Sequence, residues 1–148
     1  MSLRLVLSLA FVAVAFSKVL ALSDEEKAAI HGSVLKFVQE CSTEYNISEE
    51  KLKEAKEKKS TEGIEPCAIG CVFKKAKFIN DQGLYEPERA KEIGAKYVNA
   101  EEDRKKYAEI ADECASVNDE SVSDGDKGCE RAKLLLACMA KHKDALQI

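Results

Sequence analysis

Six cysteines are the residues of this sequence best suited to chemistry, and they occupy positions 41, 67, 71, 114, 129 and 138. In an oxidising compartment an even number of cysteines predicts disulfide bonds, whereas closely spaced pairs with nearby histidines predict structural zinc. Only Cys67 and Cys71 are close together, and neither His31 nor His142 lies near them in the sequence. We therefore expect three disulfides and no metal, while the pairing stays open.

The N-terminal residues predict that the chain is secreted. Arg4 gives a positive start, residues 5–16 form an apolar run, and Val19 and Ala21 fit a cleavage site. The apolar run is too short to span a membrane, which takes about 20 residues. Residues 1–21 are therefore expected to be a signal peptide, followed by a single extracellular domain over residues 22–148.

The charge balance excludes two classes of partner. The full sequence has 23 basic and 27 acidic side chains, a net charge of −4. The predicted signal peptide contains Arg4 and Lys18 but no acid, so its removal changes the net charge from −4 to −6. Binding to nucleic acids or to anionic lipids needs clustered Lys and Arg. We expect neither nucleic-acid binding nor membrane insertion.

The remaining polar residues do not form a catalytic motif. The sequence has no nucleophile elbow, no His-Glu-x-x-His and no glycine-rich phosphate loop. Its carboxylates are mixed with basic residues, as in residues 101–106, which is typical of solvated helix faces. The sequence therefore predicts a protein that is not an enzyme and that carries no cofactor.

Amphipathic helices must position the cysteines. Apolar residues recur at three-and-four spacing, and helix-start signals occur at Ser23, Ser48, Pro66 and Pro87. An acidic, glycine-bearing loop is expected over residues 118–128. The predicted helices cover residues 24–43, 49–59, 65–79, 87–98, 101–117 and 129–145.

Cysteine spacing on these helices predicts how they are joined. Cys129 and Cys138 are nine residues apart and lie on opposite faces of a helix, whereas Cys67 and Cys71 share one face. The third and sixth helices must therefore each bond to two neighbours. Residues 134–140 are apolar all round, which predicts burial of the sixth helix. The expected fold class is all-α, a compact six-helix domain stapled by disulfides.

The full spacing pattern, Cys-x25-Cys-x3-Cys-x42-Cys-x14-Cys-x8-Cys, resembles the six-cysteine signature of insect odorant-binding proteins, the pheromone-binding and general-odorant-binding family. The resemblance implies an internal hydrophobic cavity that carries small hydrophobic ligands (odorants, pheromones or lipid-like molecules) through aqueous fluid to olfactory receptors. It also implies the disulfide pairs Cys41–Cys71, Cys67–Cys129 and Cys114–Cys138.

The wall of such a cavity should consist of inward-facing apolar side chains with one or two polar groups. Tyr97 and Tyr107 are the expected hydrogen-bond donors to a ligand oxygen, and solid core is the alternative for each position. The expected ligand-binding residues are Ile30, Val34, Val38, Val72, Phe73, Ala76, Ile93, Tyr97, Tyr107, Ile110, Leu134, Leu135 and Met139.

Two further functions fit the same sequence. One is a non-sensory secreted carrier in haemolymph, a reproductive gland or saliva, and the other is a solidly packed secreted interaction module. A monomer or a weak homodimer is expected.

Asn46-Ile47-Ser48 is an N-glycosylation sequon. Its Asn46 also suits a turn, and its Ser48 also suits a helix cap.

Overall fold

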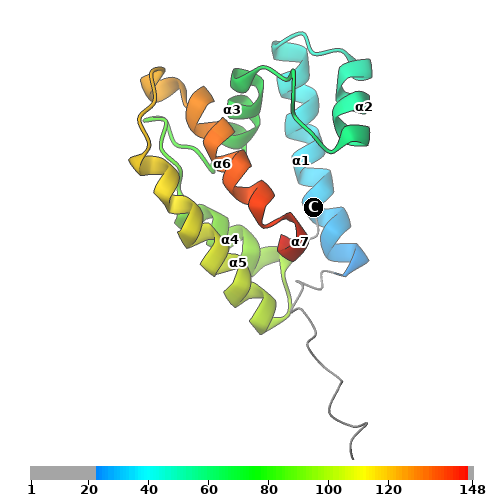
Figure 1. The fold of residues 1–148 in the computed structure, drawn as a ribbon. Coiled ribbons are helices and arrows are strands. Elements are labelled where there is room, and N and C mark those ends of the chain that lie inside the picture. Colours follow the sequence, from blue (N-terminus) through cyan, green and yellow to red (C-terminus); the bar gives the residue numbers. More distant parts are fainter. Residues whose placement is uncertain (1–22, 147–148) are drawn as a thin grey trace, which may run out of the picture.

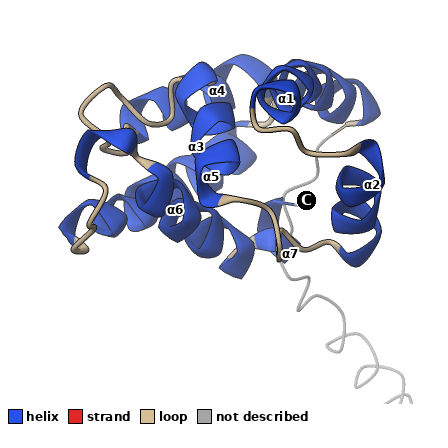
Figure 2. Ribbon diagram, turned by 90° about the horizontal axis from the view of Figure 1, so that it is seen from above, coloured by secondary structure: helices blue, strands red, loops and turns tan. Residues whose placement is uncertain are grey.

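The computed structural model describes residues 23–146, so the predicted signal peptide lies outside the described residues. The described chain is all-α, as expected, and its one strand-like pairing is an isolated bridge between Ile79 and Tyr85 (Figures 1 and 2). The α-helices are α1 (Asp24–Glu44), α2 (Glu49–Lys58), α3 (Pro66–Lys75), α4 (Pro87–Tyr97), α5 (Glu101–Glu113), α6 (Cys129–Lys141) and α7 (Lys143–Leu146), with short 3-10 helices η1 (Cys114–Asp119) and η2 (Gly125–Lys127).

The helices begin where the sequence predicts. Ser23 and Glu26 form a reciprocal capping box at α1, in which the Glu26 N–H donates to Ser23 Oγ at 3.2 Å. Ser48 Oγ accepts from the Lys51 N–H at the start of α2. Pro66 and Pro87 each occupy the first turn of a helix, where a missing N–H costs no hydrogen bond.

Three predicted helix ends are wrong. The third helix stops at Lys75 rather than Ile79, because Lys77 adopts the left-handed conformation at φ 61° and turns the chain. The fifth stops at Glu113 and tightens into η1, and the sixth breaks after Lys141, at His142. Apolar spacing continues through all three places, so periodicity alone does not mark these ends.

Burial is concentrated in one part of the molecule. The α4, α5, α6 and η1 segments surround the most deeply buried side chains, whereas α1 contributes only Cys41 and Ser42 to the buried residues and α2 contributes none. The expected burial of the sixth helix holds for one side of α6 only, since Lys133 and Ala137 are exposed. The buried core cluster consists of Ile79, Tyr85, Ala90, Ile110, Ala111, Cys114, Val117, Ala132 and Leu135.

Three disulfides connect these elements, and their pairing is the one implied by the resemblance. Cys41–Cys71 joins α1 to α3, Cys67–Cys129 joins α3 to α6, and Cys114–Cys138 joins the start of η1 to α6. Helix α3 packs against both α1 and α6. Gly70 permits the close approach of α3 to α6, because a Cβ there would lie 3.3 Å from the Cys129 Cα.

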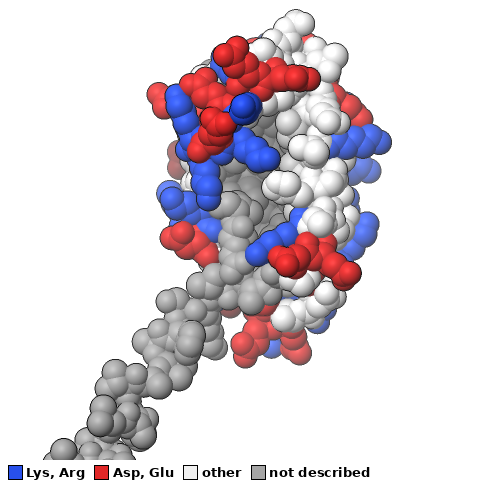
Figure 3. Space-filling model, turned by 90° about the vertical axis from the view of Figure 1, so that its right-hand side faces the viewer, with Lys and Arg blue, Asp and Glu red and all other residues white. Residues whose placement is uncertain are grey.

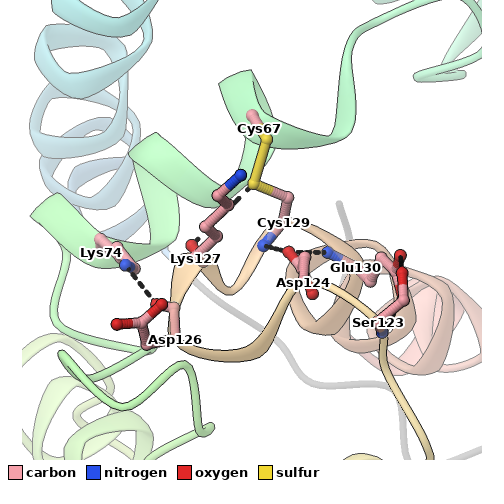
Figure 4. The surroundings of a disulfide bond; sticks show 8 residues. All are labelled: Cys67, Lys74, Ser123, Asp124, Asp126, Lys127, Cys129 and Glu130. Carbon is pink, nitrogen blue, oxygen red and sulfur yellow. Dashed lines mark hydrogen bonds between the residues drawn. A yellow bond between two sulfur atoms is a disulfide. The ribbon is translucent and has the colours of Figure 1, made fainter.

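The acidic loop before α6 is held in place by its own side chains (Figure 4). Asp124 Oδ2 accepts from the backbone N–H groups of Cys129 at 2.7 Å and Glu130 at 3.1 Å, so a carboxylate caps the N-terminus of α6. Lys74 Nζ on α3 donates to the Asp126 carbonyl at 2.8 Å. The loop therefore fixes α6 beside the Cys67–Cys129 bridge.

None of the described helices combines the length and the apolar content that crossing a membrane would require.

Candidate ligand-binding site

A small apolar pocket lies inside the core, where α4, α5 and α6 converge. Its volume is about 10 Å³, about the room of one water molecule. A pocket for a small organic ligand usually measures about 300–1,000 Å³. A bound ligand therefore requires neighbouring side chains to move. The pocket is lined by Tyr85, Ala90, Tyr107, Ile110, Ala111, Cys114 and Met139.

The hydroxyl of Tyr85 is held within this core. It donates to the Ala111 carbonyl at 3.2 Å, while the Tyr85 backbone N–H and C=O pair with the side-chain amide of Asn118 at 2.8 and 2.9 Å. Burial raises the pKa of Tyr85, and it also raises the pKa of Tyr107. Both phenols are therefore neutral near pH 7 and serve as polar but uncharged groups.

Three of the expected ligand-binding residues line this pocket, namely Tyr107, Ile110 and Met139. Tyr107 and Met139 are partly buried and pack against the core cluster, and Ile110 belongs to it. Leu134 also packs against the cluster, and Leu135 is fully enclosed by it. The structure thus brings the α5 and α6 part of the expected set together around one interior space.

The expected residues of α1 lie outside that pocket. Ile30 and Val38 are half-buried, and Val34 is 41% exposed. Figure 3 looks onto the side where α1 and α2 lie, and it shows charged side chains gathered on one part of this face and a band of uncharged side chains on another. Leu35, next to Val34, is 53% exposed, so this part of α1 is an apolar surface without a full packing partner in residues 23–146.

The expected residues of α3 and α4 are intermediate in burial. Val72, Phe73, Ala76 and Ile93 are all half-buried, and Phe73 packs edge-on against Phe78 with ring centroids 6.0 Å apart. None of these four lines the pocket, although Phe73 packs against the core cluster.

Tyr97 has a different environment from Tyr107. Hydrogen bonding to Ser33 on α1 and then to Lys96 lowers the pKa of the Tyr97 hydroxyl, and Lys96 Nζ lies 5.0 Å from the Tyr97 ring centroid. The Tyr97 side chain is half-buried, in contrast to the pocket-lining Tyr107.

Four pocket residues were missed by the sequence reasoning: Tyr85, Ala90, Ala111 and Cys114. Ala90 and Ala111 lie on the apolar stripes of their helices, and small residues on such stripes are a usable signal for a pocket. Tyr85 precedes α4 and pairs with Ile79 in the isolated bridge, where helical periodicity carries no information. Cys114 was assigned only to a disulfide.

One group of potential metal ligands lies next to the pocket. The side chains of Cys114, Cys138 and His142 place one ligand atom each within 4.8 Å of one another. Both sulfurs are joined in a disulfide, so neither offers the thiolate that binds zinc. His142 Nε2 instead lies 3.3 Å from Glu113 Oε1. This group therefore connects α6 to η1 by the disulfide and the end of α6 to the last residue of α5 by a polar contact.

The fold and the pocket define a class: a small all-helical binding protein held together by three disulfides. The model of the PBP/GOBP family matches residues 23–142, and the chain belongs to this family of insect odorant-binding proteins. Its members are binding proteins for odorants and other hydrophobic ligands, and they are not enzymes.

Among solved structures, the chain is similar to the odorant-binding protein dmelOBP28a from Drosophila melanogaster. The two share 23% sequence identity with a TM-score of 0.59, and the match covers 82% of this chain and 96% of the other. At this identity the likeness shows the fold alone. A comparison with curated proteins found no match.

Proposed function

We propose that this protein is a secreted carrier that binds small hydrophobic ligands, such as odorants or pheromones, and transports them through aqueous fluid to receptors. Family membership supports a hydrophobic ligand, and the family is typically secreted. The observation that carries the proposal is the apolar interior: the pocket walls on α4, α5 and α6 are apolar, and the partly buried Ile69 and Phe73 of α3 pack against the same core cluster.

Ligand entry requires the interior to expand, and the elements best suited to move are the Met139 side chain and helix α1. Met139 has three rotatable bonds, so it adapts to ligands of different shape. Helix α1 buries only Cys41 and Ser42, both near its C-terminal end, so outward movement of the rest of α1 exposes little core. We propose that the ligand extends from the small pocket toward α1 and contacts the expected residues of α3, α4 and α6.

The first test is ligand binding by the secreted protein itself. The full sequence is expressed in insect cells, the protein is purified from the medium, and its N-terminus and three disulfides are verified by mass spectrometry. Titration with N-phenylnaphthylamine, followed by competition with long-chain alcohols and esters, should show saturable one-site binding. Reduction of the disulfides should abolish that binding.

A matched pair of variants locates the site. Ala111→Leu places a bulky side chain in the pocket and should weaken fluorophore binding by about tenfold or more. Ala137→Leu makes the same change at an exposed position of α6 and should leave affinity unchanged. Equal affinity of both variants and the wild type would place the ligand elsewhere.

The small volume of the pocket supports a second candidate, a solidly packed secreted interaction module. Absence of fluorophore binding, with all three disulfides intact, would favour this module and exclude the carrier.

The Asn46 sequon is a separate proposal about the secreted protein. Asn46 is exposed in the turn between α1 and α2, where it adopts the left-handed conformation with φ 52°. We propose that Asn46 carries an N-linked glycan. A mass unchanged by glycosidase treatment of the secreted protein would exclude this modification.

A further inference from the structure

Lys106 on α5 has a buried side-chain nitrogen without a hydrogen-bond partner in the described part of the chain. Nearby lysines are paired: Lys105 Nζ lies 3.0 Å from Glu101 Oε1, and Lys91 Nζ lies 2.6 Å from Asp112 Oδ1. Lysine side chains are positively charged at neutral pH, and burying an unpaired charge is costly. An anion that reaches Lys106 would remove that cost.

The position of Lys106 on α5 connects it to the apolar pocket. Buried and half-buried positions of this helix include 103, 106, 107, 110 and 111, the spacing of one helix face. Ile110 and Ala111 line the pocket. Lys106 precedes Ile110 by four residues, about one helical turn or 6 Å along the axis. Lys106 and the pocket-lining residues Ile110 and Ala111 therefore lie on successive turns of the same face of α5.

We propose that Lys106 binds the carboxylate of a long-chain acid whose hydrocarbon tail occupies the apolar interior. This proposal rests on the carrier function and narrows its ligand class. A single ammonium is a compact point charge, which suits a monoanionic head group, and the apolar walls suit a hydrocarbon tail. An alcohol or ester of the same length offers the same tail but leaves the charge of Lys106 uncompensated.

The test compares three ligands of one chain length: hexadecanoate, hexadecanol and methyl hexadecanoate. Each displaces N-phenylnaphthylamine from the wild type and from Lys106→Met, Lys106→Arg and Lys105→Met. Lys106→Met should weaken hexadecanoate binding by about tenfold or more and leave hexadecanol binding within about twofold. Lys106→Arg keeps the charge and should retain the preference for hexadecanoate. Lys105→Met, at a neighbouring exposed position, should behave as the wild type.

A second measurement separates binding from folding. Without ligand, Lys106→Met should melt at the same temperature as the wild type or higher, because the substitution removes an uncompensated buried charge. Hexadecanoate should raise the melting temperature of the wild type more than that of the variant.

The results distinguish this proposal from the carrier function. Equal losses for hexadecanoate and hexadecanol, or no loss for hexadecanoate, would overturn the role of Lys106 while leaving the carrier intact. Failure of the wild type to bind N-phenylnaphthylamine or any of the three ligands would overturn the carrier function itself.

Discussion

Arg131 is a buried cation that bonds carbonyl oxygens rather than a carboxylate. Its side chain is 6% exposed, and its Nη1 donates to the carbonyls of Val117 and Glu120, the latter at 2.7 Å. These carbonyls lie at the end of η1, where the Val117 carbonyl also accepts from the Glu120 N–H at 3.4 Å. Arg131 therefore fixes the start of the acidic loop to α6.

Replacing Arg131 should destabilise the fold without touching the pocket. Arg131→Met removes the hydrogen-bond donor to both carbonyls and leaves the Glu120 carbonyl without a protein partner among the described residues, so the free energy of unfolding should fall by about 1–3 kcal/mol. Urea unfolding measures the change. Lys133→Met, at an exposed position of the same helix, is the control and should change stability little. A stable Arg131→Met would mean that water satisfies the carbonyls.

Glu26 joins two segments through one carboxylate. Its Oε2 accepts from the Ser23 N–H and its Oε1 accepts from the Asn99 N–H, both at 2.6 Å. These hydrogen bonds, that of Ser23 first, lower the pKa of Glu26. A lowered pKa in the folded state means that the contribution of Glu26 to stability is present above the ordinary carboxyl pKa and is lost as the pH falls through the lowered value.

The pH dependence of melting tests this contribution. Glu26→Gln should have a lower melting temperature than the wild type at pH 7, and the difference should shrink as the pH falls below about 4. Glu25→Gln changes a neighbouring exposed carboxylate and should not lower the melting temperature comparably. A difference between Glu26→Gln and the wild type that stays constant down to pH 3 would contradict the assignment.

At the scale of elements, α4 and α5 pack through a glycine. A Cβ on Gly94 would lie 2.4 Å from Tyr107 Cδ1, whereas a Cβ on Gly32 of α1 would meet no atom within 4 Å. Gly94→Ala should therefore push the Tyr107 ring away and lower stability by about 1–3 kcal/mol. Gly32→Ala should raise stability by about 0.5–1 kcal/mol, since alanine favours helix.

Both variants make the same chemical change within a helix. Opposite changes in their free energies of unfolding, measured with urea, would therefore isolate the effect of packing against Tyr107. A stabilising Gly94→Ala would show that Tyr107 moves freely. The Tyr107 ring lines the pocket, so Gly94→Ala should also alter fluorophore affinity.

The sequence predicts the helix starts better than the helix ends. A helix start depends on residues within one turn of the cap, such as Ser23, Ser48 and the two prolines. The sequence alone therefore predicts it. The end of α3 depends on backbone pairing outside the helix, because Lys77 turns the chain and Ile79 then forms an isolated bridge with Tyr85. Apolar periodicity cannot reveal such a contact.

At the scale of the whole molecule, the three disulfides differ in the length of chain they close. Cys67–Cys129 spans 62 residues and Cys114–Cys138 spans 24. Replacing each pair by serine should cost about 4 kcal/mol for the longer loop, about 1 kcal/mol more than for the shorter. Urea unfolding of both double variants, with the remaining two bridges verified by mass, measures the difference. A larger loss for the shorter loop would show that local strain or packing dominates.

The interior as a whole was only partly predictable. Helical spacing placed Tyr107, Ile110 and Met139 on inward faces, and these residues meet in the pocket. The same spacing placed Val34 inward, yet Val34 is 41% exposed. Spacing identifies the apolar face of each helix, but the distance between two faces depends on tertiary packing. The pairing of the cysteines came from resemblance, since spacing alone left it open.

Helix α1 is attached unequally at its two ends. The Cys41–Cys71 disulfide holds its C-terminal end covalently, whereas the Glu26–Asn99 hydrogen bond holds its N-terminal end. From residue 41 to residue 24 the helix is about 26 Å long. It therefore acts as a lever: a rotation of about 10° at the fixed end moves the other end by about 4–5 Å, more than the contact distance between two carbon atoms. A fold covalently closed by three bridges thus retains one mechanically compliant edge.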